Sequence, residues 1–250
     1  MEYKTGNPGL NERAFAAVPR AAVGEARMSL QGTVNKSFLM LTVLLVAALW
    51  PWTRFFEASG DPAAVSGLML SGVVGGLIVG LIITFRQTTA PYLALPYAAL
   101  QGLAIGGISA IFERRYPGIA IQAVALTFGV MAALLLAYTT KLIRVTEHFR
   151  AMVVAATGAI ALLYLASFIL GFFHIQVPFL NDASPLGIIV SLAIIVIAAL
   201  NLVMDFDFIQ TGVERGAPRY LEWYGAFALI LTLVWLYLEI LRLLGKTRQR

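Results

Sequence analysis

Cysteine is absent from the 250 residues, which excludes disulfides, thiolate catalysis and cysteine-ligated metal centres. Charged residues are scarce, at 12% against roughly 25% in an ordinary soluble domain. The sequence also lacks His-Glu-x-x-His, Gly-x-Ser-x-Gly and a Walker-type loop, the motifs of several common enzyme classes. A rhodopsin-like chain needs a lysine within its last span for a Schiff base. The last apolar stretch contains no lysine before Lys246, which stands at its extreme end. We expect no enzyme and no cofactor.

Apolar residues make up 60% of the chain, more than a soluble globule of this size can bury. A membrane-spanning helix needs about 20 mostly apolar residues, and about seven stretches qualify. They run from Phe38 to Phe56, Val65 to Phe85, Tyr92 to Phe112, Ile119 to Thr140, Ala151 to Phe173, Leu186 to Phe208 and Tyr220 to Leu244. The fold class expected is therefore all-α, a polytopic membrane protein whose first partner is the lipid bilayer.

The expected organisation is a polar N-terminal arm (residues 1–36), one membrane domain (37–245) and a basic tail (246–250). The arm has no signal-type apolar core and contains prolines and glycines, so we expect it to be cytoplasmic and partly disordered. That orientation places most loop lysines and arginines on the cytoplasmic side, and only the basic C-terminal tail conflicts with it. The net charge of +5 reports this topology, and no basic stripe predicts nucleic-acid binding.

Small residues recur in the second and third spans, as Gly72, Gly76 and Gly80, and as Gly102, Gly106, Gly107 and Ser109. Such residues let helix backbones approach closely in lipid. We expect close helix packing here. The alternative is that these faces line a narrow cavity.

Four acids lie in or beside the last two spans, and they are Asp205, Asp207, Glu222 and Glu239. An acid at the centre of a membrane helix costs about 2.5 to 3.5 kcal/mol on insertion scales, so it commonly marks a functional site. Alternatively, Asp205, Asp207 and Glu222 lie at the cytoplasmic interface and pair with Arg215 or Arg219. Counting residues from the ends of the spans places Asp205 and Glu222 at the same depth.

Glu239 stands in an apolar stretch with Arg242 one helical turn further on, so a local ion pair is one explanation for it. It lies roughly 25 Å deeper than Glu222 along a straight helix and should not reach Asp205. Asn201, one turn before Asp205, and Gln101 in the third span are candidate polar lining residues, although buried amides more often form interhelical hydrogen bonds.

Two carboxylates at hydrogen-bonding distance in a low-dielectric interior do not both ionise easily. An Asp205–Glu222 pair would therefore act as a pH-sensitive latch. The same oxygens, when ionised, are hard ligands suited to calcium. The two residues are thus a candidate calcium site as well as a candidate gate.

The chain resembles the bacterial Bax inhibitor-1-like family, a branch of the transmembrane Bax-inhibitor-motif superfamily. The matching segments are Asn7–Asn11, Met28–Lys36, Gly102–Ala110 and, most specifically, Asn201–Leu244 with its Asp-Phe-Asp-Phe-Ile and Tyr-Leu-Glu-Ile-Leu-Arg motifs. The resemblance implies a seven-helix fold with a central last helix. It also implies a calcium leak gated by protonation of paired aspartates between helices six and seven.

Asp205 matches the first latch aspartate of that family. The family's Tyr-Leu-Asp signature finds a glutamate in this chain both at Glu222 and at Glu239, and Gln101 stands where this branch has an acid. The resulting hypothesis is a pH-sensitive calcium or cation leak of the bacterial inner membrane, with Asp205 and Glu222 as the cytoplasmic gate. Asp207 would modulate the gate, and Glu239 would be a site at the outer end.

The alternative is a membrane protein that transports nothing and acts by binding membrane proteases or other helical membrane proteins, as some members of this family are thought to do. Calcium flux through the purified protein distinguishes the two hypotheses.

Overall fold

The computed structural model describes residues 21, 26–173, 180 and 182–249. Within these residues seven helices are long and apolar enough to cross a membrane, which confirms the expected all-α membrane fold. They are α2 (Leu30–Glu57), α3 (Ala63–Phe85), α4 (Ala90–Arg115), α5 (Ile119–Thr139), α6 (Glu147–Phe172), α8 (Pro185–Glu214) and α9 (Leu221–Thr247), and a short 3-10 helix, η1 (Gln87–Thr89), precedes α4.

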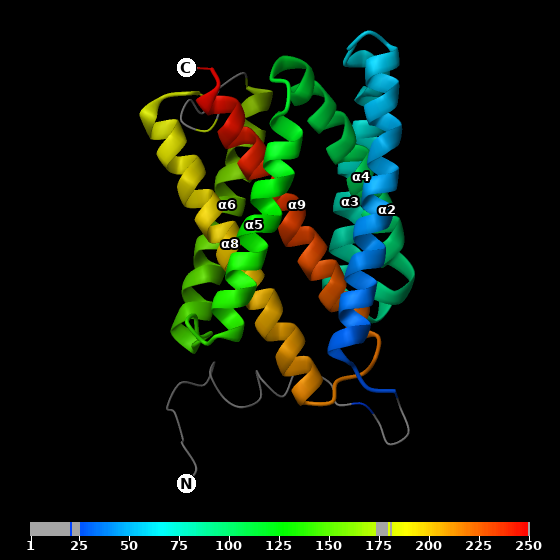
Figure 1. Cartoon of the computed structure of the whole chain (residues 1–250), viewed down its shortest axis with the longest axis vertical. Coiled ribbons are helices and arrows are strands. Elements are labelled where there is room, and N and C mark those ends of the chain that lie inside the picture. Colours follow the sequence, from blue (N-terminus) through cyan, green and yellow to red (C-terminus); the bar gives the residue numbers. More distant parts are fainter. Residues whose placement is uncertain (1–20, 22–25, 174–179, 181, 250) are drawn as a thin grey trace.

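The helices alternate in direction, so the start of α2 and the end of α9 lie at opposite ends of the bundle (Figure 1). We call the end that holds Leu30 and Glu214 the N-terminal face, and the end that holds Glu57 and Thr247 the C-terminal face. The expected N-terminal arm lies mostly outside the described residues. The last seven residues of this arm belong to α2, which begins at Leu30, where the Ser29 hydroxyl accepts a hydrogen bond from the Gly32 N–H at 3.0 Å.

Helix α4 packs against α2 on one side and α3 on the other, and the glycines predicted to pack closely lie at these two contacts. A Cβ on Gly72 would stand 2.6 Å from the backbone of Leu100 and Ala104, and one on Gly106 would stand 2.8 Å from the Cα of Ala48. Both distances are shorter than van der Waals contact. The small residues therefore allow helix packing, as expected.

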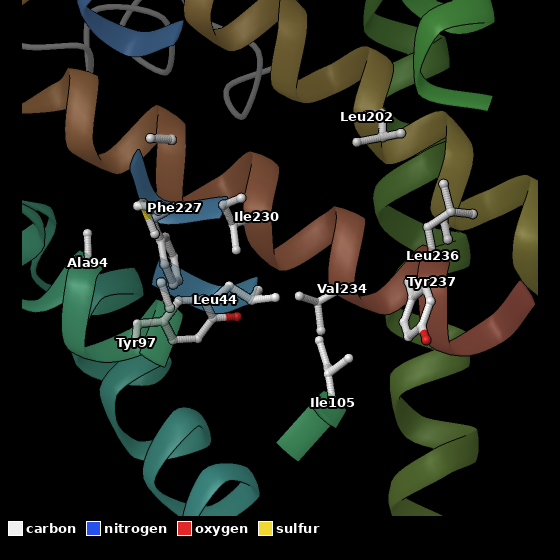
Figure 2. Close-up of a cluster of buried hydrophobic side chains, with 14 of the residues drawn as sticks. Leu44, Ala94, Tyr97, Ile105, Leu202, Phe227, Ile230, Val234, Leu236 and Tyr237 are labelled. Carbon is white, nitrogen blue, oxygen red and sulfur yellow. The ribbon is translucent and has the colours of Figure 1, made fainter. Parts of the chain in front are cut away.

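Helix α9 is the central helix, because it packs against α2, α4, α5 and α8. Its Phe227 ring meets the ring of Tyr97 from α4 edge-on, with centroids 4.8 Å apart. Figure 2 shows this pair together with Ile230 and Val234 in the buried apolar cluster. The central last helix implied by the family resemblance is confirmed.

Two basic residues near the end of the chain, Lys246 and Arg248, are hydrogen-bonded to other parts of the bundle. Lys246 is 3% exposed, and its ammonium donates hydrogen bonds to the Gly187 carbonyl at 3.1 Å and the Ser191 hydroxyl at 2.9 Å. Arg248 donates to the Pro117 carbonyl at 3.0 Å. Helix α9 continues to Thr247, so the first two residues of the expected tail belong to this helix. The charges of Lys246 and Arg248 therefore contribute contacts to α8 and to the α4–α5 connection.

Candidate functional site

Asp205 of α8 faces α9 inside the bundle. Its carboxyl group accepts a hydrogen bond from the Thr232 hydroxyl. Its other oxygen, Oδ2, is buried and has no hydrogen-bond partner within the described part of the chain. A buried carboxylate oxygen without a donor is costly, and in a membrane helix such a residue is a candidate functional site.

The depth expected for Asp205 was wrong. Helix α8 continues to Glu214, nine residues beyond Asp205, so the carboxyl lies about 14 Å along the helix from its N-terminal-face end. The polar residues that follow Phe208 lower the hydropathy of this stretch, but they do not stop the helix. Thr232 stands ten residues after Glu222, roughly 15 Å deeper along α9. Asp205 is therefore level with Thr232.

Glu222 belongs to a different cluster, at the N-terminal face. One oxygen, Oε1, accepts hydrogen bonds from the backbone N–H and the hydroxyl of Ser29, both at 2.9 Å. The other, Oε2, forms an ion pair with the Lys36 ammonium and lies 3.8 Å from Nε of Arg219. The Glu222 side chain is 2% exposed. The predicted Asp205–Glu222 pair is therefore not formed, and Glu222 instead holds the first turns of α2.

A backbone pairing brings Ser29 to Glu222. The segment before α2 runs antiparallel to the α8–α9 connection, with the Met28 N–H donating to the Ala217 carbonyl at 2.7 Å and the Arg219 N–H to the Ala26 carbonyl at 2.9 Å. Sequence reasoning missed Ser29 and Lys36 as partners of Glu222. The available signal was Ser29 itself, a typical N-cap residue. Such a residue marks the start of a helix, where backbone N–H groups have no partner within the helix.

Asp207 points away from Asp205, because residues two positions apart in a helix point in directions about 200° apart around its axis. Its carboxylate forms an ion pair with Arg150 of α6 at 2.9 Å and accepts a hydrogen bond from the Tyr138 hydroxyl of α5 at 3.3 Å. Asp207 therefore joins α5, α6 and α8. Arg215, expected as a partner for these acids, is the C-cap residue of α8, where its N–H donates to the Thr211 carbonyl at 3.0 Å.

Glu239 forms the expected local ion pair with Arg242, at 3.1 Å. The structure adds two further donors to the carboxylate, the Tyr164 hydroxyl of α6 at 2.6 Å and the Trp235 indole N–H at 3.3 Å. Arg242 also donates to the Tyr164 oxygen at 2.6 Å. Glu239 thus links α6 and α9 through a carboxylate whose hydrogen-bonding groups have partners, and it lies about 10 Å along α9 from Thr232.

The two polar candidates form helix contacts. The Asn201 amide donates to the Thr157 hydroxyl of α6 at 2.8 Å and to the Ile197 carbonyl at 2.8 Å. Gln101 is hydrogen-bonded to Tyr97 one turn earlier on α4, and its amide lies against Gly76 of α3. The interhelical hydrogen bond expected for Asn201 is present.

The four acids therefore differ in how their charge is balanced. Glu222, Asp207 and Glu239 each have a basic partner within 4 Å. Asp205 has no ion pair among the described residues. No group of three His, Cys, Asp or Glu side chains lies together in the described ranges, and calcium takes six to eight oxygen ligands. Asp205 and Glu222 thus do not form the two-carboxylate calcium site expected from the sequence.

Comparison with protein families gives a match that spans almost the whole chain. Residues 7–249 match the family described as Bax inhibitor 1 like. The searches of curated proteins and of solved structures give no match. Because the family match covers both the glycine-rich helices and the acidic end of the chain, we conclude that the chain belongs to the Bax inhibitor 1 like family of membrane proteins.

Proposed function

We propose that the protein is a pH-sensitive cation leak, permeable to calcium, in which Asp205 is the gate residue. The observation that carries this proposal is the buried Oδ2 of Asp205, which has no hydrogen-bond partner in the part of the chain that the structure describes. The other three acids have structural partners that account for their charge. Asp205 is the acid whose presence in a membrane helix these contacts do not explain.

The chemistry follows from the cost of an unpaired charge. A protonated Asp205 is neutral and needs few partners, whereas an ionised Asp205 beside Thr232 demands water or a cation at the free oxygen. The protonation state of Asp205 is thereby coupled to hydration of the space between α8 and α9. A passing cation would be held only weakly by one carboxylate and one hydroxyl, and weak binding is what conduction requires.

The Glu222 cluster supports the proposal from the N-terminal face. Glu222, Ser29 and Lys36 bind the start of α2 to the start of α9 in a buried, charged contact. We propose that an ion passing Asp205 crosses the membrane at this contact as well, which would give the cluster a closing role. We further propose the bacterial inner membrane as the location, with the N-terminal face toward the cytoplasm.

Calcium uptake into proteoliposomes that contain only the purified protein tests the proposal. The parent should show flux that changes between about pH 5 and pH 8, a window in which buried carboxyl groups titrate. Asp205→Asn should remove that pH dependence, because the amide cannot ionise. Glu57→Gln, at an exposed acid at the end of α2, is the matched control and should behave as the parent.

Two results contradict the proposal. One is a complete absence of flux across this pH range from correctly folded protein, which favours the alternative of a membrane protein that binds membrane proteases or other helical membrane proteins. The other is an unchanged pH profile in Asp205→Asn, which removes Asp205 as the gate even if the protein conducts.

A further inference from the structure

An apolar groove runs along the side of the bundle between α2 and α5. Its volume is about 530 Å³, within the range of about 300 to 1,000 Å³ of small-ligand pockets. Leu45 and Leu49 of α2 and Ile121 of α5 form its rims, while Ile105 of α4 and Val234 of α9 form its floor. Figure 1 shows α2 and α5 on either side of α9, and Figure 2 shows Ile105 and Val234 facing each other.

The groove occupies one half of the membrane depth. On α2 it extends from Leu41 to Trp52, a rise of about 16 Å. Helix α2 runs from Leu30 to Glu57, so the groove begins near the middle of this helix and ends near the C-terminal face. This length matches one leaflet, which is half of the roughly 30 Å hydrocarbon core. Trp52 closes the groove at the depth where tryptophan meets the headgroup region.

The lining has no charged residue, and its hydroxyl groups are already satisfied. The Thr127 hydroxyl donates to the Ala123 carbonyl at 2.7 Å, and the Ser109 and Tyr237 hydroxyls bond to each other at 2.7 Å. The remaining lining side chains are apolar except for the indole N–H of Trp52, at the end of the groove near the C-terminal face. The rest of the groove offers hydrocarbon contacts and no polar partner, so it suits an alkyl chain and gives no path to an ion.

The open side of the groove faces the bilayer, since its rim residues Leu45, Val46 and Ile121 are exposed by 51%, 62% and 68%. The solvent at that depth is the acyl chains of one leaflet. An empty groove would leave its lining without dispersion partners, and no hydrophobic effect brings a helix there within lipid. We propose that the groove binds one acyl chain of a phospholipid from the leaflet at the C-terminal face, with its headgroup beyond Trp52.

Photo-crosslinking of lipid to the full-length protein tests this proposal. The protein is reconstituted into bilayers of phosphatidylethanolamine and phosphatidylglycerol that contain a phosphatidylethanolamine with a diazirine on one acyl chain. After illumination, the labelled residues are mapped by mass spectrometry. A diazirine at the chain end should label residues near Leu41 and Ile230, and a diazirine near the glycerol should label residues near Trp52 and Ala120. The probe at the chain end should also label floor residues such as Val234, which is only 9% exposed.

Val124→Phe fills the groove from α5, and Val154→Phe makes the same change on the lipid-facing surface of α6, outside the groove. The first variant should lower floor labelling at least fivefold, and the second should leave it unchanged. Labelling confined to rim residues in the parent overturns the proposal without any variant. The proposal is also overturned if lipid does not label the floor residues and these residues instead crosslink to a second copy of the chain, which would make protein the occupant of the groove. The proposal is overturned as well if Val124→Phe leaves the labelling of the floor residues unchanged.

Discussion

The ion pair between Lys36 and Glu222 allows a quantitative test of whether Asp205 and Glu222, the two acids of the predicted latch, belong to separate clusters. Glu222 is 2% exposed and Lys36 14% exposed, so each charge depends on the other. Removing one partner of a buried ion pair costs about 3 to 5 kcal/mol. Because Glu222→Gln keeps an oxygen for the Ser29 donors and Lys36 keeps some contact with solvent, we expect about 2 to 3 kcal/mol for this variant.

Lys36→Met should cost about 3 kcal/mol, because it leaves the less exposed charge without its ammonium partner. The double variant removes both charges and should cost about 2 kcal/mol, well below the sum of the two single changes. Asp205→Asn combined with Glu222→Gln should instead add to within about 0.5 kcal/mol, as changes at independent sites do. Reversible unfolding of the purified protein in mild detergent gives the required free energies.

Two results would refute this reasoning. If the Lys36 and Glu222 changes simply add, the ion pair contributes no coupling and the Glu222 cluster does not hold the N-terminal face together. If Asp205→Asn and Glu222→Gln couple by more than 1 kcal/mol, the two carboxyls act as one unit. The latch expected from the sequence would then describe the protein better than two separate clusters.

Three further predictions concern other parts of the bundle. Arg242→Leu alone should destabilise the protein by about 3 kcal/mol because it strands the buried Glu239, whereas the double change to Leu should cost clearly less, as thermal unfolding in detergent would show. Gly106→Val should reduce the yield of folded protein severalfold because its side chain meets the α2 backbone, while Gly129→Val, at a glycine in open space, should not. With the N-terminal face in the cytoplasm, a cysteine at Asp182 should react with an impermeant thiol reagent from the periplasm and one at Thr146 should not; the reverse pattern would invert the orientation.

The spans could be predicted closely because the length and apolar content of a helix are local properties. Helix α5 begins at Ile119, as expected, and ends at Thr139, one residue early. The end of α8 was predicted six residues too early, because the apolar stretch ends at Phe208. Polar residues such as Gln210 and Thr211 continue the helix beyond that stretch. That error alone moved Asp205 too close to the N-terminal face.

The partners of the acids could likewise be predicted only where they are close in sequence. Glu239 and Arg242 are one turn apart, so their ion pair followed from helical spacing. Glu222 contacts Ser29, which is 193 residues away in sequence, and spacing carries no information on such a pair. The Tyr164 hydroxyl bound to Glu239 is likewise 75 residues away. Sequence reasoning identified which residues are unusual and could not supply the long-range contacts that distinguish a structural acid from a candidate gate.

The antiparallel contact between residues 26–28 and 217–219 also constrains the order in which the chain becomes a complete bundle. Ser29 and Lys36 leave the ribosome about 190 residues before Glu222, an interval of roughly 10 to 40 s at 5 to 20 residues per second. During synthesis the first helix therefore enters the membrane with its N-cap and its lysine still without their final partner. The N-terminal face closes only after the last loop has been translated, so a chain truncated before Glu222 retains an open end.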